Sequence, residues 1–346
     1  MSYYDQTFEP WTIVDGQCVV ADESEWQKLV GLNEYHADDL RRWNRWADRT
    51  GAHDHKDYSP PKSPIVKIAT DIFEDVTGPI NVAGYQKGFV EGTGGRPLIH
   101  EDILTSFFQT IDANPHVDYL LTTQRPELVR EKWPQVSSEL FVVNVAHSLP
   151  GKSIEALEVF RSNVILAIYV ETQADIERLV PELLKCHDLC KGLAVVCNPK
   201  EKLNFESVRV NIDPEESYGD EWCYRDILSG YDHHPEWGSR ESFSEPLIDL
   251  IIAEGNEHPI HPDWLRTLRD QCKDANVPFN FAQWGGFIPS SCVPPCPDTG
   301  HYLWPWKDKG DETMMLAIDA ERSGRLLDGE EHNGQIETPV NQNGGQ

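Results

Sequence analysis

The chain has 346 residues, enough to bury the core of one large α/β domain or of two smaller domains. Its 58 acidic and 30 basic residues give a formal net charge of -28. This excludes a general binder of the phosphate backbone, since that function needs a basic surface. No stretch approaches the ~20 apolar residues of a membrane span, so no membrane partner is expected. The first residues resemble no secretory signal, and we predict a cytoplasmic protein.

Short apolar runs that end in polar residues recur along the chain and alternate with helical patterns. The predicted strands are 65–70, 119–122, 164–170, 193–197 and 250–253, and residues 247–284 form a complete strand, helix and strand unit. The predicted helices are 102–112, 125–132, 173–186 and 263–276. This alternation predicts right-handed crossovers and a parallel sheet. Because no glycine-rich dinucleotide fingerprint follows the first strand, we favour an α/β fold that is a partial or complete (β/α) TIM-like barrel.

Three segments interrupt the pattern and predict loop insertions. Residues 78–97 are rich in glycine, residues 205–246 combine acidic and aromatic side chains, and residues 288–309 are too rich in proline for a helix or a central strand. The second of these is expected to be a structured excursion. We therefore predict a divergent N-terminal segment over residues 1–60, a barrel over 61–328 and a flexible tail over 329–346.

Polar side chains that follow the predicted strands are the first candidates for a site, because ligands of parallel α/β folds bind at the C-terminal ends of the strands. These candidates are Asp71, Glu74, Arg125, Glu171, Asn198, Glu254, Glu257, His258, Gln283 and Trp284. Some of the acids have a simpler alternative role as helix N-caps, as Asp71 before Ile72 and Asp263 before Trp264.

The tightest cluster of soft ligands is Cys292, Cys296 and His301, which would suit tetrahedral zinc if a fourth ligand came from elsewhere. The alternative is a proline-rich loop with two free cysteines. Cys186 and Cys190 lie four residues apart in a helical pattern, where packing of both toward the core is the simpler explanation. Eight cysteines in a chain of this length do not predict a dense disulfide framework.

Six blocks of the chain carry, in order, a resemblance to a known family. They lie at residues 66–76, 118–129, 163–184, 248–272, 277–289 and 324–329, and the most specific is HPDWLRTLRDQC followed by VPFNFAQWG. Over about residues 60–330 the chain resembles the phage-associated three-cysteine-motif protein family related to radical-SAM enzymes. The resemblance implies a barrel of the radical-SAM type. It also implies an N-terminal cysteine loop that holds a [4Fe–4S] cluster for reductive cleavage of S-adenosylmethionine.

The chain departs from that family at the cluster loop. Its first 60 residues contain only Cys18, and one cysteine cannot supply three thiolate ligands, so a [4Fe–4S] cluster is not expected. Gln124 stands where the family has Lys, Asn198 where it has Glu, and residues 253–256 where it has G-G-E-S. The family residues that match are Arg125, Glu171, Gln283 and Trp284. We assign candidate catalytic roles to Asp71, Arg125, Glu171, Glu254, Glu257 and His258, cofactor-binding roles to Gln283, Trp284 and Asn198, and metal-binding roles to Cys292, Cys296 and His301.

Three functional hypotheses follow. The first is a cluster-free, radical-SAM-like barrel that acts as a binding or regulatory protein in a phage or mobile-element setting, with a small molecule or a protein as partner and S-adenosylmethionine as candidate cofactor. The second is a hydrolase or lyase that uses carboxylates and His258 at the strand ends, with or without zinc. The third is an acidic decoy that occupies a nucleic-acid-binding protein.

Overall fold

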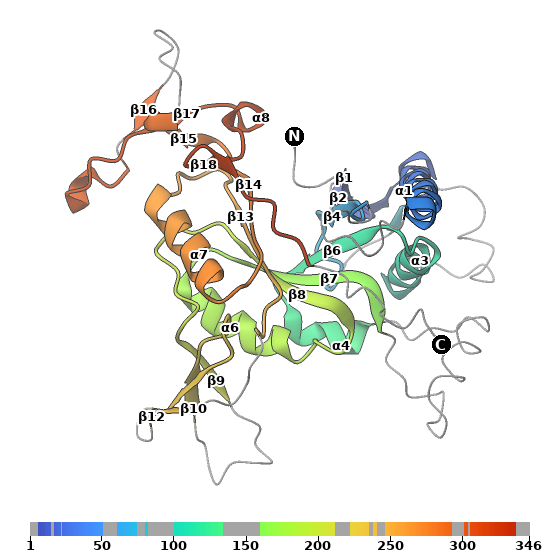
Figure 1. The fold of residues 1–346 in the computed structure, drawn as a ribbon, viewed down its shortest axis with the longest axis horizontal. Coiled ribbons are helices and arrows are strands. Elements are labelled where there is room, and N and C mark those ends of the chain that lie inside the picture. The colour runs from blue at the N-terminus through green and yellow to red at the C-terminus, as the bar shows by residue number, and fades with distance from the viewer. Residues whose placement is uncertain are drawn as a thin grey trace. The chain divides into compact units, whose positions relative to one another are not determined.

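A computed structural model gives the fold (Figure 1). The residues that it describes are 6–14, 17–21, 23–50, 61–74, 80–81, 100–133, 160–211, 222–234, 238–240, 246–292, 301–303 and 305–336. The chain divides into two compact units. Unit 1 comprises Met1–Tyr3, Ala167–Lys185 and Gly192–Gln346, and unit 2 comprises Tyr4–Leu166 and Cys186–Lys191.

A seven-stranded sheet is the main element of this mixed α/β fold. Its strands, in spatial order, are β1 (Gln6–Phe8), β4 (Ile65–Ile68), β6 (Asp118–Thr123), β7 (Arg161–Val170), β8 (Cys190–Cys197), β13 (Leu250–Glu254) and β14 (Phe279–Gln283). The pairs β1–β4, β4–β6, β8–β13 and β13–β14 are parallel. The spatial order follows the chain order without reversal. A doubly wound sheet reverses its order at a switch point, so this arrangement is compatible with a partial (β/α) barrel.

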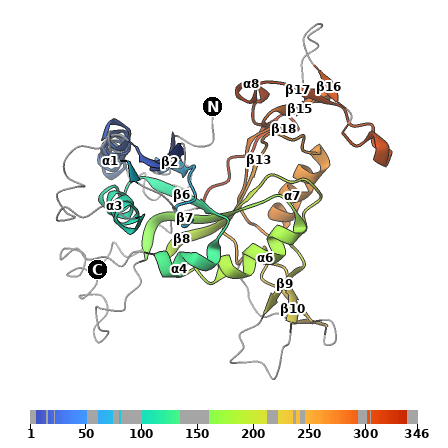
Figure 2. The ribbon, with the colours of Figure 1, turned by 180° about the vertical axis from the view of Figure 1, so that it is seen from behind.

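Unit 2 packs aromatic side chains between its strands and helices. Its helical elements are α1 (Glu23–Thr50), α3 (His100–Ala113), η2 (Pro126–Leu128) and α4 (Val129–Lys132), and a small sheet joins β2 (Trp11–Val14), β3 (Gln17–Val20) and β5 (Ile80–Asn81). Trp26 of α1 contacts Phe8 of β1 and Phe107 of α3, with ring centroids 4.9 Å and 6.2 Å apart. Helices α1 and α3 therefore pack together, as Figure 2 shows from behind.

Two ion pairs that contain a buried cation tie the first residues of β7 and β8 into unit 2. The Arg161 guanidinium donates to Asp112 at 2.8 Å and lies over the ring of Phe108, 4.5 Å from its centroid. The Lys191 ammonium lies 2.6 Å from the Asp118 carboxylate, and both side chains are at least nine-tenths buried. Each charge thus has a partner, which a buried ion requires.

Unit 1 contains the second half of the large sheet, two long helices and three small sheets. The helices are α6 (Gln173–Leu184), α7 (Pro262–Asp274) and the short α8 (Ala320–Ser323), with 3-10 turns η4 (Ser290–Cys292) and η5 (Lys307–Lys309). The small sheets are β12 (Gly238–Arg240)–β11 (Asp232–His234)–β10 (Trp222–Arg225)–β9 (Val208–Asn211), β15 (Phe287–Pro289)–β17 (Met315–Ala317)–β16 (Tyr302–Leu303), and β18 (Leu326–Leu327)–β19 (Glu330–Glu331).

Most predicted elements are confirmed, and the differences lie at the ends of the chain and at element boundaries. The predicted helix 125–132 is instead a 3-10 turn followed by one α-helical turn, because Pro126 has no amide hydrogen and suits only a first turn. The expected N-terminal segment contains α1 and supplies β1 to the large sheet. Within the expected flexible tail, the amide of Gly334 donates to the carbonyl of Phe279 at 3.0 Å, so residues 332–334 run along β14. The rest of the tail, 337–346, and most of 78–97 lie outside the described residues.

Among the described helices, none combines the length and the apolar character that crossing a bilayer requires.

Candidate functional site

The C-terminal ends of β7, β8, β13 and β14 meet at one edge of the sheet within unit 1. Cys197 of β8 pairs with Ala253 of β13, and Glu254 pairs with Gln283 of β14. The amide of Asn198 donates to the carbonyl of Val170 at 2.9 Å. The residues that end these strands therefore lie in register. We call Tyr169, Asn198, Glu254, Asn256 and Gln283 the strand-end cluster.

The phenol of Tyr169 is the centre of this cluster. The Asn198 Nδ2 group donates to the Tyr169 hydroxyl at 2.6 Å. Burial raises the pKa of Tyr169 above its usual value, the nearby carboxylates of Glu171 and Glu254 raise it further, and hydrogen bonds from Asn198 and Asn256 partly oppose the shift. The phenol is therefore neutral at pH 7, and it can donate a hydrogen bond to a carboxylate or to a ligand.

The amide oxygen of Asn198 has no hydrogen-bond partner among the described residues, although the residue is completely buried. A buried carbonyl oxygen without a donor costs roughly 1–3 kcal/mol, so native proteins seldom retain one without a reason. A ligand or an ordered water that brings a donor would satisfy it. This orphan acceptor is the strongest sign that the strand-end cluster receives another molecule.

Glu171 follows β7 and is held by the start of the next helix. The amide of Lys200 donates to the Glu171 carbonyl at 2.8 Å, and the Lys200 ammonium forms a short ion pair with its carboxylate. Thr172 and Asp175 form a capping box that begins α6. The carboxylate of Glu171 thus lies beside the cluster with its charge already balanced.

The loops after β13 and β14 cross so closely that only glycine fits. A Cβ atom on Gly255 would lie 1.9 Å from the carbonyl oxygen of Trp284, and one on Gly285, whose φ is +74°, would lie 2.4 Å from the carbonyl carbon of Gly255. The register of β13 against β14 also shifts between Ala253 and Glu254. Such irregularities redirect a side chain at the end of a strand, here that of Glu254.

The other predicted residues of unit 1 differ in their surroundings. Trp284 is buried, and its indole N–H donates to the carbonyl of Leu326 at 3.0 Å. The only polar group of this side chain is therefore already hydrogen-bonded within the protein. Gln283 is exposed, and its Nε2 lies 3.5 Å from the Gly255 carbonyl. Glu257 is exposed, whereas His258 is half-buried, and its Nε2 has no partner among the described residues.

Asp71 and Arg125 belong to unit 2. The carboxylate of Asp71 accepts from the Thr123 hydroxyl at 2.9 Å, from the Gln124 amide at 2.8 Å and from the Phe73 amide at 3.1 Å. The expected helix N-cap is therefore not formed, because residues 72–74 are a turn; one carboxylate oxygen caps that turn, and the other links it to the end of β6. The Arg125 side chain is exposed and donates to Glu127 at 2.7 Å.

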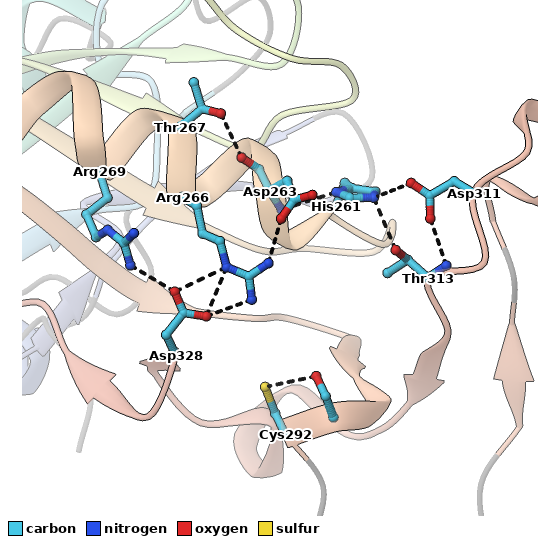
Figure 3. A network of polar contacts seen from close by, with 10 residues as sticks. His261, Asp263, Arg266, Thr267, Arg269, Cys292, Asp311, Thr313 and Asp328 are labelled. Carbon is cyan, nitrogen blue, oxygen red and sulfur yellow. Dashed lines mark hydrogen bonds and ion pairs between the residues drawn. The ribbon is translucent and has the colours of Figure 1, made fainter.

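A histidine–aspartate pair at the start of α7 resembles a catalytic dyad but caps the helix (Figure 3). His261 Nδ1 accepts from the Asp263 amide at 3.1 Å, and Nε2 lies 2.7 Å from the Asp311 carboxylate. Both ring nitrogens are therefore engaged: Nδ1 accepts, Nε2 donates, and neither is available to a substrate. Hydrogen bonds from the Thr313 side chain and amide, with a further one from His261, lower the pKa of Asp311 to about 2.

The proposed zinc ligands are only partly described. Cys292 is exposed, with its sulfur 4.0 Å from the Ser291 hydroxyl, and His301 is also exposed. Cys296 lies outside the described residues. Within the described ranges, no three His, Cys, Asp or Glu side chains are grouped as metal ligands. Cys186 and Cys190 are both buried, but the expectation that they share one helix is wrong, because α6 ends at Leu184 and Cys190 is the first residue of β8.

Two residues of the cluster, Tyr169 and Asn256, were missed by the sequence reasoning. Tyr169 stands inside the apolar run VILAIYV, where a tyrosine reads as an ordinary strand residue. Its polar tip one residue before the strand end is the signal that could have identified it. Asn256 follows Glu254 and Gly255 in the same loop, and its backbone carbonyl accepts from the Gly286 amide at 2.8 Å.

Comparison with known proteins gives one family. No curated protein matches the chain, and no solved structure matches it. A family model described as a protein of unknown function, DUF5131, matches residues 95–335, which include the whole strand-end cluster. The chain therefore belongs to the DUF5131 family.

Proposed function

We propose that this protein is a cluster-free, radical-SAM-like barrel that binds a small polar molecule at the strand-end cluster, and that it acts by binding and not by radical chemistry. The observation that carries the proposal is the amide oxygen of Asn198, which is buried beside the Tyr169 hydroxyl and has no donor in the part of the chain that the structure describes. A phage or mobile-element setting and a regulatory role belong to the same proposal and rest on the resemblance of the sequence blocks.

The chemistry of the cluster supports a ligand with hydrogen-bond donors. Asn198 presents an acceptor, Glu254 presents a carboxylate, and the Tyr169 phenol and the Asn256 amide complete a polar wall. S-adenosylmethionine has an ammonium group and ribose hydroxyls, so it is the first ligand to test. A [4Fe–4S] cluster does not fit the chain, because Cys18 stands alone among the first 60 residues.

Calorimetric titration with S-adenosylmethionine tests the binding. We expect one saturable site, at least tenfold weaker in Asn198→Leu, which is about 1.4 kcal/mol and the scale of one good hydrogen bond. Asn163→Leu, which makes the same change at a buried asparagine of unit 2, serves as a matched control that should retain affinity if it folds. Equal affinity in the native protein and Asn198→Leu would exclude the cluster as the site, and no binding at all would exclude this ligand.

Anaerobic reconstitution with iron and sulfide tests the absence of radical chemistry. We expect no thiolate-to-iron absorption bands and no stoichiometric iron in the reconstituted protein. A bound cluster at one equivalent would overturn this part of the proposal.

A second candidate, proton-transfer catalysis by a hydrolase or lyase, is favoured by one observation. The neutral Tyr169 phenol stands near the carboxylates of Glu171 and Glu254, and an acid beside a base is the arrangement that such enzymes use. Its zinc-dependent form predicts one equivalent of zinc in protein purified without chelator, lost in Cys292→Ser. Absence of zinc from the native protein would remove that form.

A further inference from the structure

Residues 41–49 of helix α1 reverse the acidic character of the chain. They contain four arginines and a single acid, Asp48, whereas the whole chain has a net charge of -28. The segment has no lysine, and two tryptophans lie between the arginines. Arginine differs from lysine in that its planar guanidinium binds phosphate through two N–H groups and stacks on aromatic faces. This composition is therefore typical of a surface that meets phosphates and aromatic rings.

The helical spacing places several of these side chains on one exposed face of α1. Residues 35, 42, 45, 46 and 49 lie three, four or seven positions from a neighbour in this set, so they share one side of the helix. All five are exposed, and the exposed fraction is 67% for Tyr35 and 69% for the side chain of Arg42. The face extends about 21 Å along the helix axis. We call Tyr35, Arg42, Arg45, Trp46 and Arg49 the α1 strip.

The opposite face of α1 is fixed in the core of unit 2. Trp26, Leu29, Ala37 and Ala47 on that face are buried, and the Trp26 ring packs against β1 and α3. Figure 1 shows α1, in blue, beside α3. The α1 strip is therefore held in place on the surface, and the helix cannot turn its apolar face toward a membrane.

The charges of the α1 strip are only partly compensated. Arg45 and Arg49 form no ion pair with a residue in the described ranges, and the ion pair of Arg42 is 3.5 Å long. Asp38, which lies beside the strip, pairs with Arg41. The hydrogen bond and the charge of Arg41, followed by the charges of two arginines of the strip, lower the pKa of Asp38 below its usual value. The electrostatic field along this side of α1 is therefore positive.

These features favour a single-stranded nucleic acid over other polyanions. An anionic membrane requires aliphatic side chains that insert, and the α1 strip has none. A duplex presents a wide charged surface that the acidic remainder of the chain would repel. A single strand, in contrast, can lie along one helix and offers unpaired bases to aromatic rings. We propose that the α1 strip binds single-stranded nucleic acid, with its three arginines paired to phosphates and its two aromatic rings stacked on bases. Such a narrow site is compatible with a chain that is not a general binder of the phosphate backbone.

Fluorescence anisotropy of labelled oligonucleotides tests the proposal on the full-length protein. Oligo(dT) and oligo(U) of about 15 nucleotides would be titrated at several salt concentrations. We expect saturable binding with a slope of about -2 in log K against log salt, since each phosphate contact on a single strand contributes about -0.7. Arg45→Gln and Arg49→Gln should each weaken binding about fivefold and reduce the slope by about 0.7. The control Arg322→Gln, at an exposed position of α8 in unit 1, should do neither.

The variant Tyr35→Leu separates stacking from charge. It removes a ring on which a base would stack and changes no charge, so we expect affinity to fall about fivefold or more at an unchanged salt slope. Tyr231→Leu makes the same change at an exposed tyrosine of unit 1 and should leave the affinity unchanged.

Absence of binding to either oligonucleotide would overturn the proposal, as would equal losses in the strip variants and their controls. Equal affinity for a duplex of the same length would also overturn it, because it would indicate general attraction to phosphate. Displacement of the oligonucleotide by poly-L-glutamate or by phosphatidylserine vesicles at equal charge would overturn it in favour of an acidic protein or a membrane.

Melting temperatures of all variants would confirm that they fold, which we expect because every changed side chain is exposed. Asn198→Leu leaves the α1 strip intact and should retain oligonucleotide binding. Failure of this proposal and failure of the proposed function are therefore distinguishable.

Discussion

The substitution Asn198→Leu tests whether the polar groups of the strand-end cluster lower the free energy of unfolding of the protein without ligand. In the protein without ligand, the Asn198 side chain makes one hydrogen bond, to the Tyr169 hydroxyl at 2.6 Å, while its amide oxygen lacks a donor. Losing the hydrogen bond costs about 1 kcal/mol, and removing the unsatisfied oxygen returns roughly 1–3 kcal/mol. The two side chains are similar in size, so little strain is expected. The free energy of unfolding should therefore stay unchanged or rise by up to about 2 kcal/mol.

The matched control Asn163→Leu should change the free energy of unfolding in the opposite direction. Asn163 is also buried, but its Nδ2 donates to the carbonyls of Ile111 and Asn114, at 3.1 Å and 3.3 Å. Asn163→Leu leaves both carbonyls without that donor and should lower the free energy of unfolding by about 2 kcal/mol or more.

Urea denaturation of both variants, followed by far-ultraviolet circular dichroism, measures the two changes. A shift of the midpoint with an unchanged slope reports a change of stability alone. If Asn198→Leu destabilised the protein by more than about 2 kcal/mol, the oxygen would be satisfied in the free protein, and the reasoning that makes it a ligand acceptor would fail.

Three further predictions concern the structure outside the ligand contacts. Gly255→Ala should lower the free energy of unfolding by about 3 kcal/mol or more, since its Cβ would lie 1.9 Å from the Trp284 oxygen. The control Gly31→Ala, in open space on α1, should raise the free energy of unfolding by about 1 kcal/mol, and equal urea midpoints for the two variants would contradict both expectations. Lys191→Met should lower the free energy of unfolding by roughly 3–5 kcal/mol, because it leaves the buried Asp118 carboxylate unpaired. The double variant Lys191→Met/Asp118→Leu should recover much of that loss, and a double variant as unstable as the single one would contradict the ion pair. Asp311 has a pKa of about 2 against an unfolded value of 3.8, so it stabilises the protein above pH 3.8 and this contribution is lost as the pH falls to 2; Asp311→Asn should abolish that part of the pH dependence, measured by thermal unfolding from pH 5 to 2.

The strands of the large sheet could be predicted from the sequence because each is an apolar run buried on both faces. Val164 to Val170 and Leu193 to Cys197 illustrate this, since nearly every residue in them is buried. Strand β1 could not be predicted, because three residues are too few to show the alternation of apolar and polar side chains that marks a strand. It joins the sheet through pairing with β4. The path of residues 332–334 along β14 is likewise set by backbone hydrogen bonds, which leave no signature in side-chain type.

The location of the strand-end cluster could be predicted, but its membership only in part. Asn198, Glu254 and Gln283 follow apolar runs and stand out as polar residues at strand ends. The role of Trp284 could not be read from its position, because its indole N–H donates to the carbonyl of Leu326, 42 residues away.

The features that break ordinary packing rules gather in the strand-end cluster. The unsatisfied oxygen of Asn198, the crossing of Gly255 with Gly285 and the register shift before Glu254 all lie at the ends of β8, β13 and β14. Local and global preferences normally agree throughout a protein, and conflicts concentrate where function requires them. The capping network of His261, in contrast, satisfies both of its ring nitrogens and so gives no such sign. Two groups of polar side chains lie around the loop after β13, the His261 network and the strand-end cluster. Of these two groups, as far as the structure describes them, only the strand-end cluster contains an unsatisfied polar atom, so it is the one that we expect to bind a ligand.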